Sequence, residues 1–341
     1  MTNSKYNLQI LDEKEYPSWD TFVELSPQGT LFHTTQWARI IEHVFKRSFE
    51  ILVLNKNDHI CAGILYWPKK VMFLNAITNI PNTTYQGIIF QQPISTKSST
   101  VNAEYQQQVE IILNKLTSEF HLIDIPLSPG IVDIRPFEWA GFKAKTSYTY
   151  TFPIIDFEML KKQFSQDLRR KIKKILNSEN VFKESTETKL VAQFVMDSYK
   201  KHNTSPAISQ PLLKAFMDNC IENKIGRLFY QHSNGKPVAG IFILSDNKTI
   251  YALFSGISKT ARNEINSELL HTFILIQPEF IGKNFDFLGA NTQYFEQFKR
   301  SFGGNLGPYF KVNYTRNLTI KPIFLSRLII HKAKRKLKSF Y

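Results

Sequence analysis

The sequence predicts an α/β (α+β) protein that is built from two duplicated domains with mixed central sheets. Three observations lead to this fold class. Short apolar strands alternate with amphipathic helices along the chain, as in units that pack helices against a sheet. One hairpin pattern occurs twice, about 180 residues apart. The length of 341 residues also suffices for two or three domains of ordinary size.

Each predicted hairpin has an apolar strand, a turn that contains asparagine, and a second strand with Ala-Gly at the same place. The three segments are Phe49–Leu54, Asn55–Asp58 and His59–Tyr66 in the first hairpin, and Arg227–Gln231, His232–Gly235 and Lys236–Ile243 in the second. Asn234-Gly235 is a strong turn signal, because both residues tolerate positive φ. The two hairpins therefore indicate a duplicated domain.

Helices are predicted where apolar residues recur at helical spacing. These segments are Gln36–Phe45, Glu104–Glu119, Phe157–Ser178, Leu190–Tyr199, Gln210–Glu222 and Ile265–Ile276. A strand, Leu122–Ile125, is followed by Pro126 and Pro129 and closes the first half, and a seam follows near residues 146–156. The expected divisions are an N-terminal domain at 1–150, a C-terminal domain at 151–320, and a basic amphipathic tail at 321–341.

The composition favours a globular cytoplasmic protein with a large core. Hydrophobic residues make up 43%, and the 28 phenylalanines are expected to serve mainly in packing. No uninterrupted apolar run approaches the roughly 18 residues that cross a bilayer, and Met1–Tyr16 is too polar for a secretory signal. Cys61 and Cys220 lie far apart among apolar residues, which predicts buried, reduced thiols.

Positive charge is in excess, with a formal net charge of +14 from 43 Lys+Arg and 29 Asp+Glu. It is concentrated in Arg169–Lys174 and again in Arg327–Lys338. Such clusters attract phosphates of nucleic acid, of a nucleotide cofactor or of anionic lipid. The alternative is a solvated basic face that serves solubility.

Residues 285–304 form the most informative stretch. Phe285–Asn291 (FDFLGAN) and Tyr294–Gly304 (YFEQFKRSFGG) predict a short buried strand, a loop, and a helix that ends at glycine. Strand ends of this kind are where α/β proteins bind ligands. The stretch resembles the C-terminal signature of the Fem-type aminoacyltransferases, that is, of the FemAB-like and BioF2-like relatives of the peptidoglycan bridge enzymes.

Three further segments carry the same resemblance in the same order. They are Phe32–Trp37 (FHTTQW), Asp133–Phe142 (DIRPFEWAGF) with Tyr148–Thr151, and the basic helix at Arg169–Ile172. The family is built from two GNAT-like acyltransferase domains. The resemblance therefore implies an enzyme that transfers an acyl or aminoacyl group to an amine, on a cell-envelope or polysaccharide precursor.

Acyl transfer needs a neutral amine, aligned reactants and a donor for the oxyanion, so few protein groups suffice. By resemblance, Lys299 stabilises the reacting carbonyl and Phe298 shapes the pocket. Asp286 alternates with its apolar neighbours and faces the other way, where it would accept a proton from the amine or orient Lys299. Alternatively, Lys299 is an exposed lysine on the helix surface, and Asp286 pairs with a neighbouring arginine. Relatives often carry Glu where this chain has Leu288.

Substrate contacts are expected from aromatic, polar and basic side chains of both halves. These residues are Trp37, Arg39, Tyr251, Ser255, Asn291, Tyr294, Phe298 and Tyr309. No HExxH, CxxC or GxSxG motif occurs and the eight histidines are scattered, so we expect neither a metal nor a permanently bound cofactor.

The donor is expected to be acyl-CoA or aminoacyl-tRNA. GNAT proteins that use CoA hold its pyrophosphate with a glycine-rich turn. Ser255–Asn263 has one glycine, so Lys259 and Arg262 are the predicted phosphate contacts. The basic surface suits tRNA, although no heptad run predicts the coiled-coil arm of several Fem-type enzymes.

The tail, Pro322–Tyr341, mixes apolar residues with a basic end. It is expected either to lie on the inner face of a membrane, as suits a lipid-linked amine acceptor, or to dock on the core.

Two rival functions of the whole chain stay open. One is an acyl-CoA-dependent N-acetyltransferase of a small-molecule amine, and the other is a non-catalytic module that binds RNA or anionic lipid.

Overall fold

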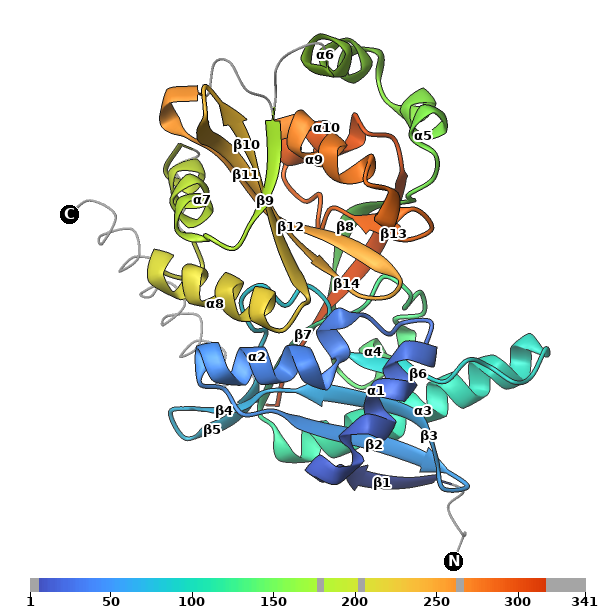
Figure 1. Ribbon diagram of the computed structural model, residues 1–341. Helices are drawn as coiled ribbons and strands as arrows, with labels where there is room; N and C mark the ends of the chain where they lie inside the picture. The colour runs from blue at the N-terminus through green and yellow to red at the C-terminus, as the bar shows by residue number, and fades with distance from the viewer. Residues whose placement is uncertain (1–5, 177–180, 202–205, 262–266, 317–341) are drawn as a thin grey trace, which may run out of the picture. The chain divides into compact units, whose positions relative to one another are not determined.

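The computed structural model describes residues 6–176, 181–201, 206–261 and 267–316 (Figure 1). The chain divides into two compact units. Unit 1 comprises residues up to Ser147 and those from Pro308 onward, and unit 2 comprises Tyr148–Gly307. The limits expected for two continuous domains, 1–150 and 151–320, stay a prediction, and the tail at 321–341 lies outside the described residues.

Both units contain their main elements in the same order: a strand, two helices, three antiparallel strands, a helix, a strand and a helix. In unit 1 these are β1 (Tyr6–Ile10), α1 (Tyr16–Leu25), α2 (Thr35–Phe45), β2 (Glu50–Lys56), β3 (His59–Tyr66), β6 (Ile88–Phe90), α3 (Ser98–Glu119), β7 (Leu122–Pro126) and α4 (Arg135–Trp139). In unit 2 they are β9 (Val181–Ser185), α7 (Lys189–Lys201), α8 (Gln210–Glu222), β10 (Gly226–Ser233), β11 (Lys236–Ser245), β12 (Thr249–Ile257), α9 (Ser267–Leu275), β13 (Asn284–Asp286) and α10 (Gln293–Arg300). The predicted duplication is therefore present in the topology.

The sheets of the two units follow the same strand order. Unit 1 has β1-β2-β3-β6, and unit 2 has β9-β10-β11-β12 with β13 added in parallel. Unit 1 also contains β4 (Pro68–Val71) and β5 (Leu74–Ile77), which precede β6 and pair with each other. The remaining long strands are β8 (Lys143–Pro153) and β14 (Asn305–Thr315). The predicted mixed sheets are confirmed.

Both hairpins form as predicted. Positive φ occurs in both turns, although it was expected only at Asn234-Gly235. Asn57 and Asp58 have φ of 52° and 63°, and Asn234 and Gly235 have φ of 51° and 75°. The repeated Ala-Gly pair has a packing reason. A Cβ on Gly63 would lie 2.6 Å from the Trp19 ring of α1. A Cβ on Gly240 would lie 2.9 Å from the Tyr230 ring of β10 and 3.2 Å from Val191 of α7. In each unit the missing side chain makes room beside the helix that follows the first strand of the repeated order, α1 or α7.

In unit 2, successive side chains of each strand point to opposite faces of the sheet, and helices cover both faces. Ala239, Ile241 and Ile243 of β11 lie in one buried cluster with Leu270 and Ile274 of α9. Helices α7 and α8 lie on the other side of the sheet (Figure 1). A core on both faces fixes α7 and α9 on opposite sides of the same strands.

The predicted helix over Phe157–Ser178 was wrong in one respect, because the segment forms two helices. These are α5 (Phe157–Gln163) and α6 (Gln166–Leu176). Phe164 has extended backbone, and Ser165 caps α6 by accepting a hydrogen bond from the Leu168 amide at 3.2 Å. The apolar period continues across the break, since Leu160, Phe164, Leu168 and Ile172 are all buried.

Other helix predictions differ from the structure only at their ends. Helix α3 begins at Ser98, before the predicted Glu104. Helix α9 covers Ser267–Leu275, and Ile265 lies outside the described residues. The limits of α8 agree with the prediction.

Cys61 and Cys220 are buried free thiols, as expected, and burial raises the pKa of Cys61 to about 11.

No helix in the described part of the chain combines the length and apolar character needed to cross a bilayer. Within the same residues, no three His, Cys, Asp or Glu side chains gather in a way that could hold a metal ion.

Packing of α7 against β12 makes a testable prediction at Gly256. A Cβ there would lie 2.7 Å from the backbone carbon of Phe194 and 2.8 Å from the amide of Val195. We expect Gly256→Ala to lower the free energy of unfolding by about 1–3 kcal/mol, because backbone cannot move aside as a side chain can. Gly307→Ala is the matched control, since nothing lies within 4 Å of its Cβ. Equal stabilities of the two variants in urea unfolding would contradict this packing.

Candidate active site

The site begins where two parallel strands of unit 2 stop pairing. β12 and β13 pair over Thr249–Tyr251 and Asn284–Asp286 only, whereas β12 continues to Ile257. A bulge in β12 leaves Leu253 without a counterpart on β11 just past this point. Bulges bend a strand and are frequent next to active sites. Because β13 ends at Asp286, β12 has no β13 partner beyond Tyr251, and this leaves a gap in the sheet beside β12.

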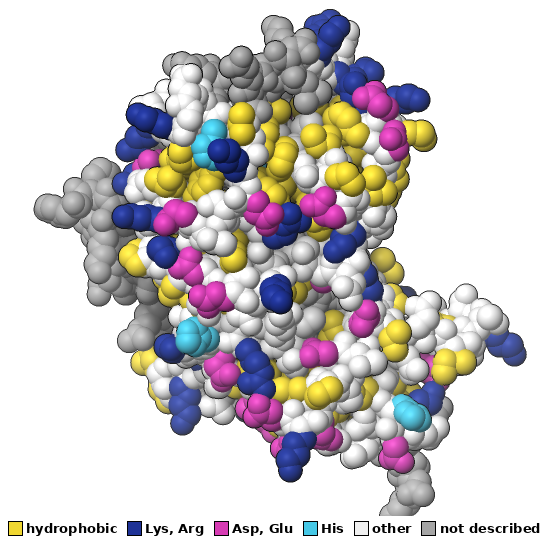
Figure 2. Space-filling model, in the orientation of Figure 1, with side chains coloured by type: hydrophobic (Ala, Val, Ile, Leu, Met, Phe, Trp, Pro, Cys, Tyr) yellow, Lys and Arg dark blue, Asp and Glu magenta, His cyan; other side chains and the backbone are white. Residues whose placement is uncertain are grey.

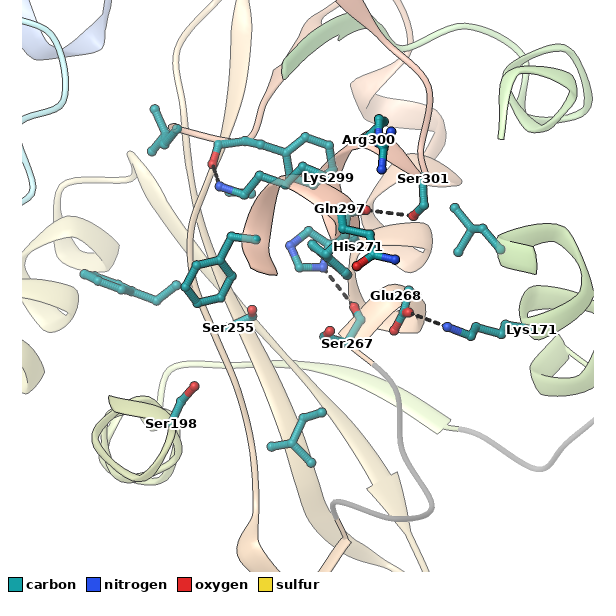
Figure 3. A pocket seen from close by; sticks show the side chains of 18 of the residues that line it. Lys171, Ser198, Ser255, Ser267, Glu268, His271, Gln297, Lys299, Arg300 and Ser301 are labelled. Atoms are coloured by element: carbon teal, nitrogen blue, oxygen red, sulfur yellow. Dashed lines mark hydrogen bonds and ion pairs between the residues drawn. The ribbon is translucent and has the colours of Figure 1, made fainter. Parts of the chain in front are cut away.

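A cavity of about 1000 Å³ lies at this gap. Its wall comes from α6, α7, β12, α9, the exit of β13 and α10, all in unit 2. The side chains that bear on its chemistry are Asp167, Lys171, Ser255, Glu268, His271, Phe298 and Lys299. Figure 3 labels five of them, Lys171, Ser255, Glu268, His271 and Lys299. The cavity thus lies at the exit of a strand, the place that the sequence predicts for a ligand.

Lys299 is half-buried on α10, and its Nζ donates hydrogen bonds to the backbone carbonyls of Phe287, at 2.7 Å, and of Gly289. Nζ also lies 5.8 Å from the centroid of the Phe287 ring. Burial lowers the pKa of Lys299 to about 8, and the charge of Asp286 opposes that shift. The ammonium is therefore mostly protonated at pH 7, although it lies in a poorly solvated place.

A second set of hydrogen bonds shapes the turn that presents these carbonyls. The buried Asp286 accepts hydrogen bonds through Oδ1 from Thr149 Oγ1, at 2.6 Å, and from the Leu288 amide, at 2.7 Å. Thr149 Oγ1 in turn accepts one from the Gly289 amide at 3.0 Å. Leu288 has a φ of 53°, which is uncommon outside glycine. Asp286 thus stabilises the turn that holds Lys299, and it does not line the cavity.

Aromatic rings cover one side of the cavity. The ring of Phe298 lies 5.4 Å from that of Phe302 and 6.2 Å from that of Phe287. The imidazole of His271 lies among these three rings. This apolar wall excludes water from the neighbourhood of Lys299, which strengthens electrostatic interactions there.

An ion pair lies on another side of the cavity. Lys171 of α6 lies 3.1 Å from Glu268 of α9 and 3.1 Å from Asp167 of its own helix. The hydrogen bond to Glu268 raises the pKa of Lys171. The side chain of Glu268 is only 16% exposed, so its charge is partly desolvated and needs this partner.

Of the residues predicted from the sequence, the structure brings Lys299, Phe298 and Ser255 together around the cavity. Asn291 is exposed, and its Oδ1 accepts a hydrogen bond from the Tyr148 amide at 2.8 Å. Tyr251 is buried away from the cavity wall and donates to Asp246 at 2.8 Å.

Three other predicted residues belong to unit 1. Trp37 is fully buried and donates to Thr83 Oγ1 at 3.2 Å. Arg39 is an exposed partner of Glu13, and Tyr309 is buried. None of the three lines the cavity of unit 2.

The predicted phosphate contacts are only partly described. Lys259 is exposed and lies 3.4 Å from Asp197. Arg262 and the side chain of Tyr294 lie outside the described residues. On the basic helix α6, Arg169, Arg170 and Lys173 are exposed. Basic side chains project from this end of unit 2 in Figure 2. Lys171 departs from that pattern, because it turns toward Glu268.

Sequence reasoning missed His271, Glu268 and Lys171. Helical periodicity in the sequence predicts which face of α9 is buried, but it does not predict which other helices and strands pack against that face. Scattered histidines also carry no motif. A signal for the α5–α6 break was present, because Ser165 followed by Gln166 and Asp167 is typical of a helix N-terminus.

The buried ammonium makes a prediction about stability and pH. The folded state of Lys299 loses its proton near pH 8, whereas an unfolded lysine keeps it to about pH 10.4. Between these values the unfolded chain binds more protons, so folding gains stability as pH rises. Relative to Lys299→Met, the wild type is expected to gain about 1–3 kcal/mol in free energy of unfolding between pH 7 and about pH 10. Denaturant titrations check this, and a difference that stays constant with pH would contradict it.

A comparison with known protein families identifies a domain that contains this cavity. Residues 162–300 match the profile of the acetyltransferase (GNAT) domain. The match covers α6 through α10, and with them nearly all residues that line the cavity. It confirms, for this part of the chain, the predicted class of enzyme, an acyltransferase. Among curated proteins, no sequence matches this chain.

Solved structures share the fold over almost the whole chain. The crystal structure of FemX has a TM-score of 0.68 and 13% identity, over 89% of this chain and 96% of FemX. L-PGS from Bacillus licheniformis has a TM-score of 0.53 and 12% identity, over 93% of this chain and 97% of that one. A tandem GNAT protein from the clavulanic acid biosynthesis pathway has a TM-score of 0.52 and 7% identity, over 91% and 99%. The predicted architecture of two tandem GNAT-like domains, as in Fem-type proteins, is confirmed, and the BioF2-like resemblance stays a prediction.

Proposed function

We propose that this chain transfers an aminoacyl or acyl group from an activated ester or thioester to an amine, in the cavity of unit 2. The observation that carries the proposal is the position of Lys299. An ammonium has three N–H donors. Two of them are taken by the carbonyls of Phe287 and Gly289. Among the described residues, no partner takes the third, and Lys299 lines the cavity.

The third donor suits the charge that acyl transfer creates. When an amine attacks the donor carbonyl, negative charge develops on the carbonyl oxygen. A fixed ammonium in a water-poor site stabilises this oxyanion more strongly than it stabilises the neutral ground state. The two carbonyl hydrogen bonds hold Nζ in place, so little reorganisation is needed when the charge forms.

We infer that the donor is an aminoacyl ester, as on aminoacyl-tRNA. Glu268 places a carboxylate in the first turn of α9, where a CoA pyrophosphate would benefit from positive charge. The carboxylates of Glu268 and Asp167 share one cation, Lys171, so the three side chains together keep a negative charge that would attract the ammonium of an aminoacyl group. The exposed cations of α6 suit the phosphates of tRNA. Acyl-CoA is the alternative donor.

The acceptor proposed is an amine on a cell-envelope precursor, either lipid-linked or a small molecule. Support comes from the fold shared with FemX and L-PGS. Peripheral contact with a membrane through residues 321–341 belongs to this proposal and rests on the composition of that segment.

The test supplies the purified protein with aminoacyl-tRNA or acyl-CoA and a panel of amine acceptors, and follows the acylated amine by mass spectrometry. Lys299→Ala is expected to lower the transfer rate by about 100- to 1000-fold, as the loss of an oxyanion donor does. The matched control is Lys283→Ala. Lys283 is also half-buried and donates to a backbone carbonyl, that of Asp246, at 2.6 Å outside the cavity.

The outcomes separate the candidate functions. Transfer from aminoacyl-tRNA supports the preferred donor, and transfer from acyl-CoA alone would support the small-amine acetyltransferase. Equal rates for the Lys299 and Lys283 variants would remove Lys299 from the mechanism.

A further inference from the structure

His271 lies in the wall of the cavity in a setting that differs from that of an ordinary core histidine. It is only 5% exposed, and its ring centroid lies 5.0, 5.6 and 5.9 Å from those of Phe298, Phe287 and Phe302. It nevertheless lines the cavity together with Lys299 (Figure 3). A polar ring is therefore built into the apolar wall beside the ammonium.

One hydrogen bond fixes the tautomer of this imidazole. Nδ1 lies 2.8 Å from the backbone carbonyl oxygen of Ser267, one turn earlier on α9. A carbonyl only accepts, so Nδ1 carries the proton and donates it. In the neutral ring, Nε2 is then left with a lone pair. Within the described parts of the chain, no donor reaches Nε2, and this nitrogen points away from Ser267 toward the open cavity in Figure 3.

The surroundings keep the imidazole neutral. Burial lowers the pKa of His271 to about 4, and the ammonium of Lys299 acts in the same direction. The other charged groups in the cavity wall are Asp167 and Lys171 on α6, Glu268 on α9 and Arg300 on α10. At pH 7 the ring therefore presents a free base, and not a cation, to the cavity.

We propose that Nε2 of His271 is the general base that accepts the proton of the attacking amine. This inference rests on the proposed acyl transfer. The amine nitrogen forms a bond to the donor carbonyl carbon, and its proton passes to Nε2. The bond from that carbon to the oxygen or sulfur of the donor then breaks, and the imidazolium returns the proton to the leaving atom. Lys299 stays protonated throughout and holds the oxyanion.

Electrostatics reconcile this assignment with the low pKa of His271. The oxyanion that forms beside Lys299 offsets the positive charge that depresses the basicity of His271. The carbonyl of Ser267 stabilises the imidazolium through its Nδ1–H. Asp286 is a poorer candidate, because its Oδ1 accepts from Thr149 and from the Leu288 amide, and it does not line the cavity.

Two variants test the proposal. His271→Phe keeps an aromatic ring among Phe287, Phe298 and Phe302 and removes both nitrogens. His271→Gln keeps a hydrogen-bond acceptor but cannot take up a proton at neutral pH. With the donor that the wild type uses, both variants are expected to lower the single-turnover rate by about 100-fold or more. Their midpoints of thermal unfolding are expected to stay within a few degrees of the wild type.

The pH profile separates a base from a structural residue. The wild-type rate is expected to fall at acidic pH as His271 becomes protonated, and the residual rate of His271→Phe is expected to lack that ionisation. Wild-type rates in the Phe variant, or restoration of activity by Gln, would overturn proton transfer by His271 and leave the acyltransferase proposal intact. If the wild type transfers from neither donor, the proposed function is wrong and the role of His271 is wrong with it.

Discussion

The ammonium of Lys299 connects helix α10 to the exit of strand β13. Its hydrogen bonds to the Phe287 and Gly289 carbonyls join α10 to the turn after β13. A buried charge is stable only when such partners replace the water it has lost. Asp286 and Thr149 stabilise the turn from the other side. The geometry of the site therefore depends on one charge and on the backbone that compensates it.

The cavity itself is a consequence of sheet geometry. The parallel pairing of β12 with β13 stops at Tyr251, where β13 ends, and β12 carries a bulge at Leu253 just beyond this point. The same order of elements occurs in unit 1, so duplication supplies two similar scaffolds. Their last helices differ, since α4 in unit 1 has the sequence RPFEW and no lysine, whereas α10 carries Phe298-Lys299. The buried ammonium that carries the proposed chemistry belongs to unit 2.

Local patterns predicted much of this structure. The two hairpins followed from Asn-containing turns and the repeated Ala-Gly. The packing reason for the two glycines is the closeness of Trp19 and Val191, and only the structure reveals it. Lys299, Phe298 and Ser255 were predicted near a ligand and do line one cavity. The continuous helix over Phe157–Ser178 was wrong, because apolar periodicity persists through the extended Phe164. His271 and the Lys171–Glu268 pair were missed, since they depend on contacts among helices that sequence spacing does not reveal.

The most direct test of the central claim is the pKa of the Lys299 ammonium, measured by NMR titration of isotope-labelled lysine with Lys299→Arg for assignment. The expected pKa is about 8, well below the ordinary lysine value of about 10.4, because the group is buried beside the Phe287 ring. A pKa near the ordinary value would mean that Nζ is solvated and not held by the two carbonyls. That result would contradict the proposed site.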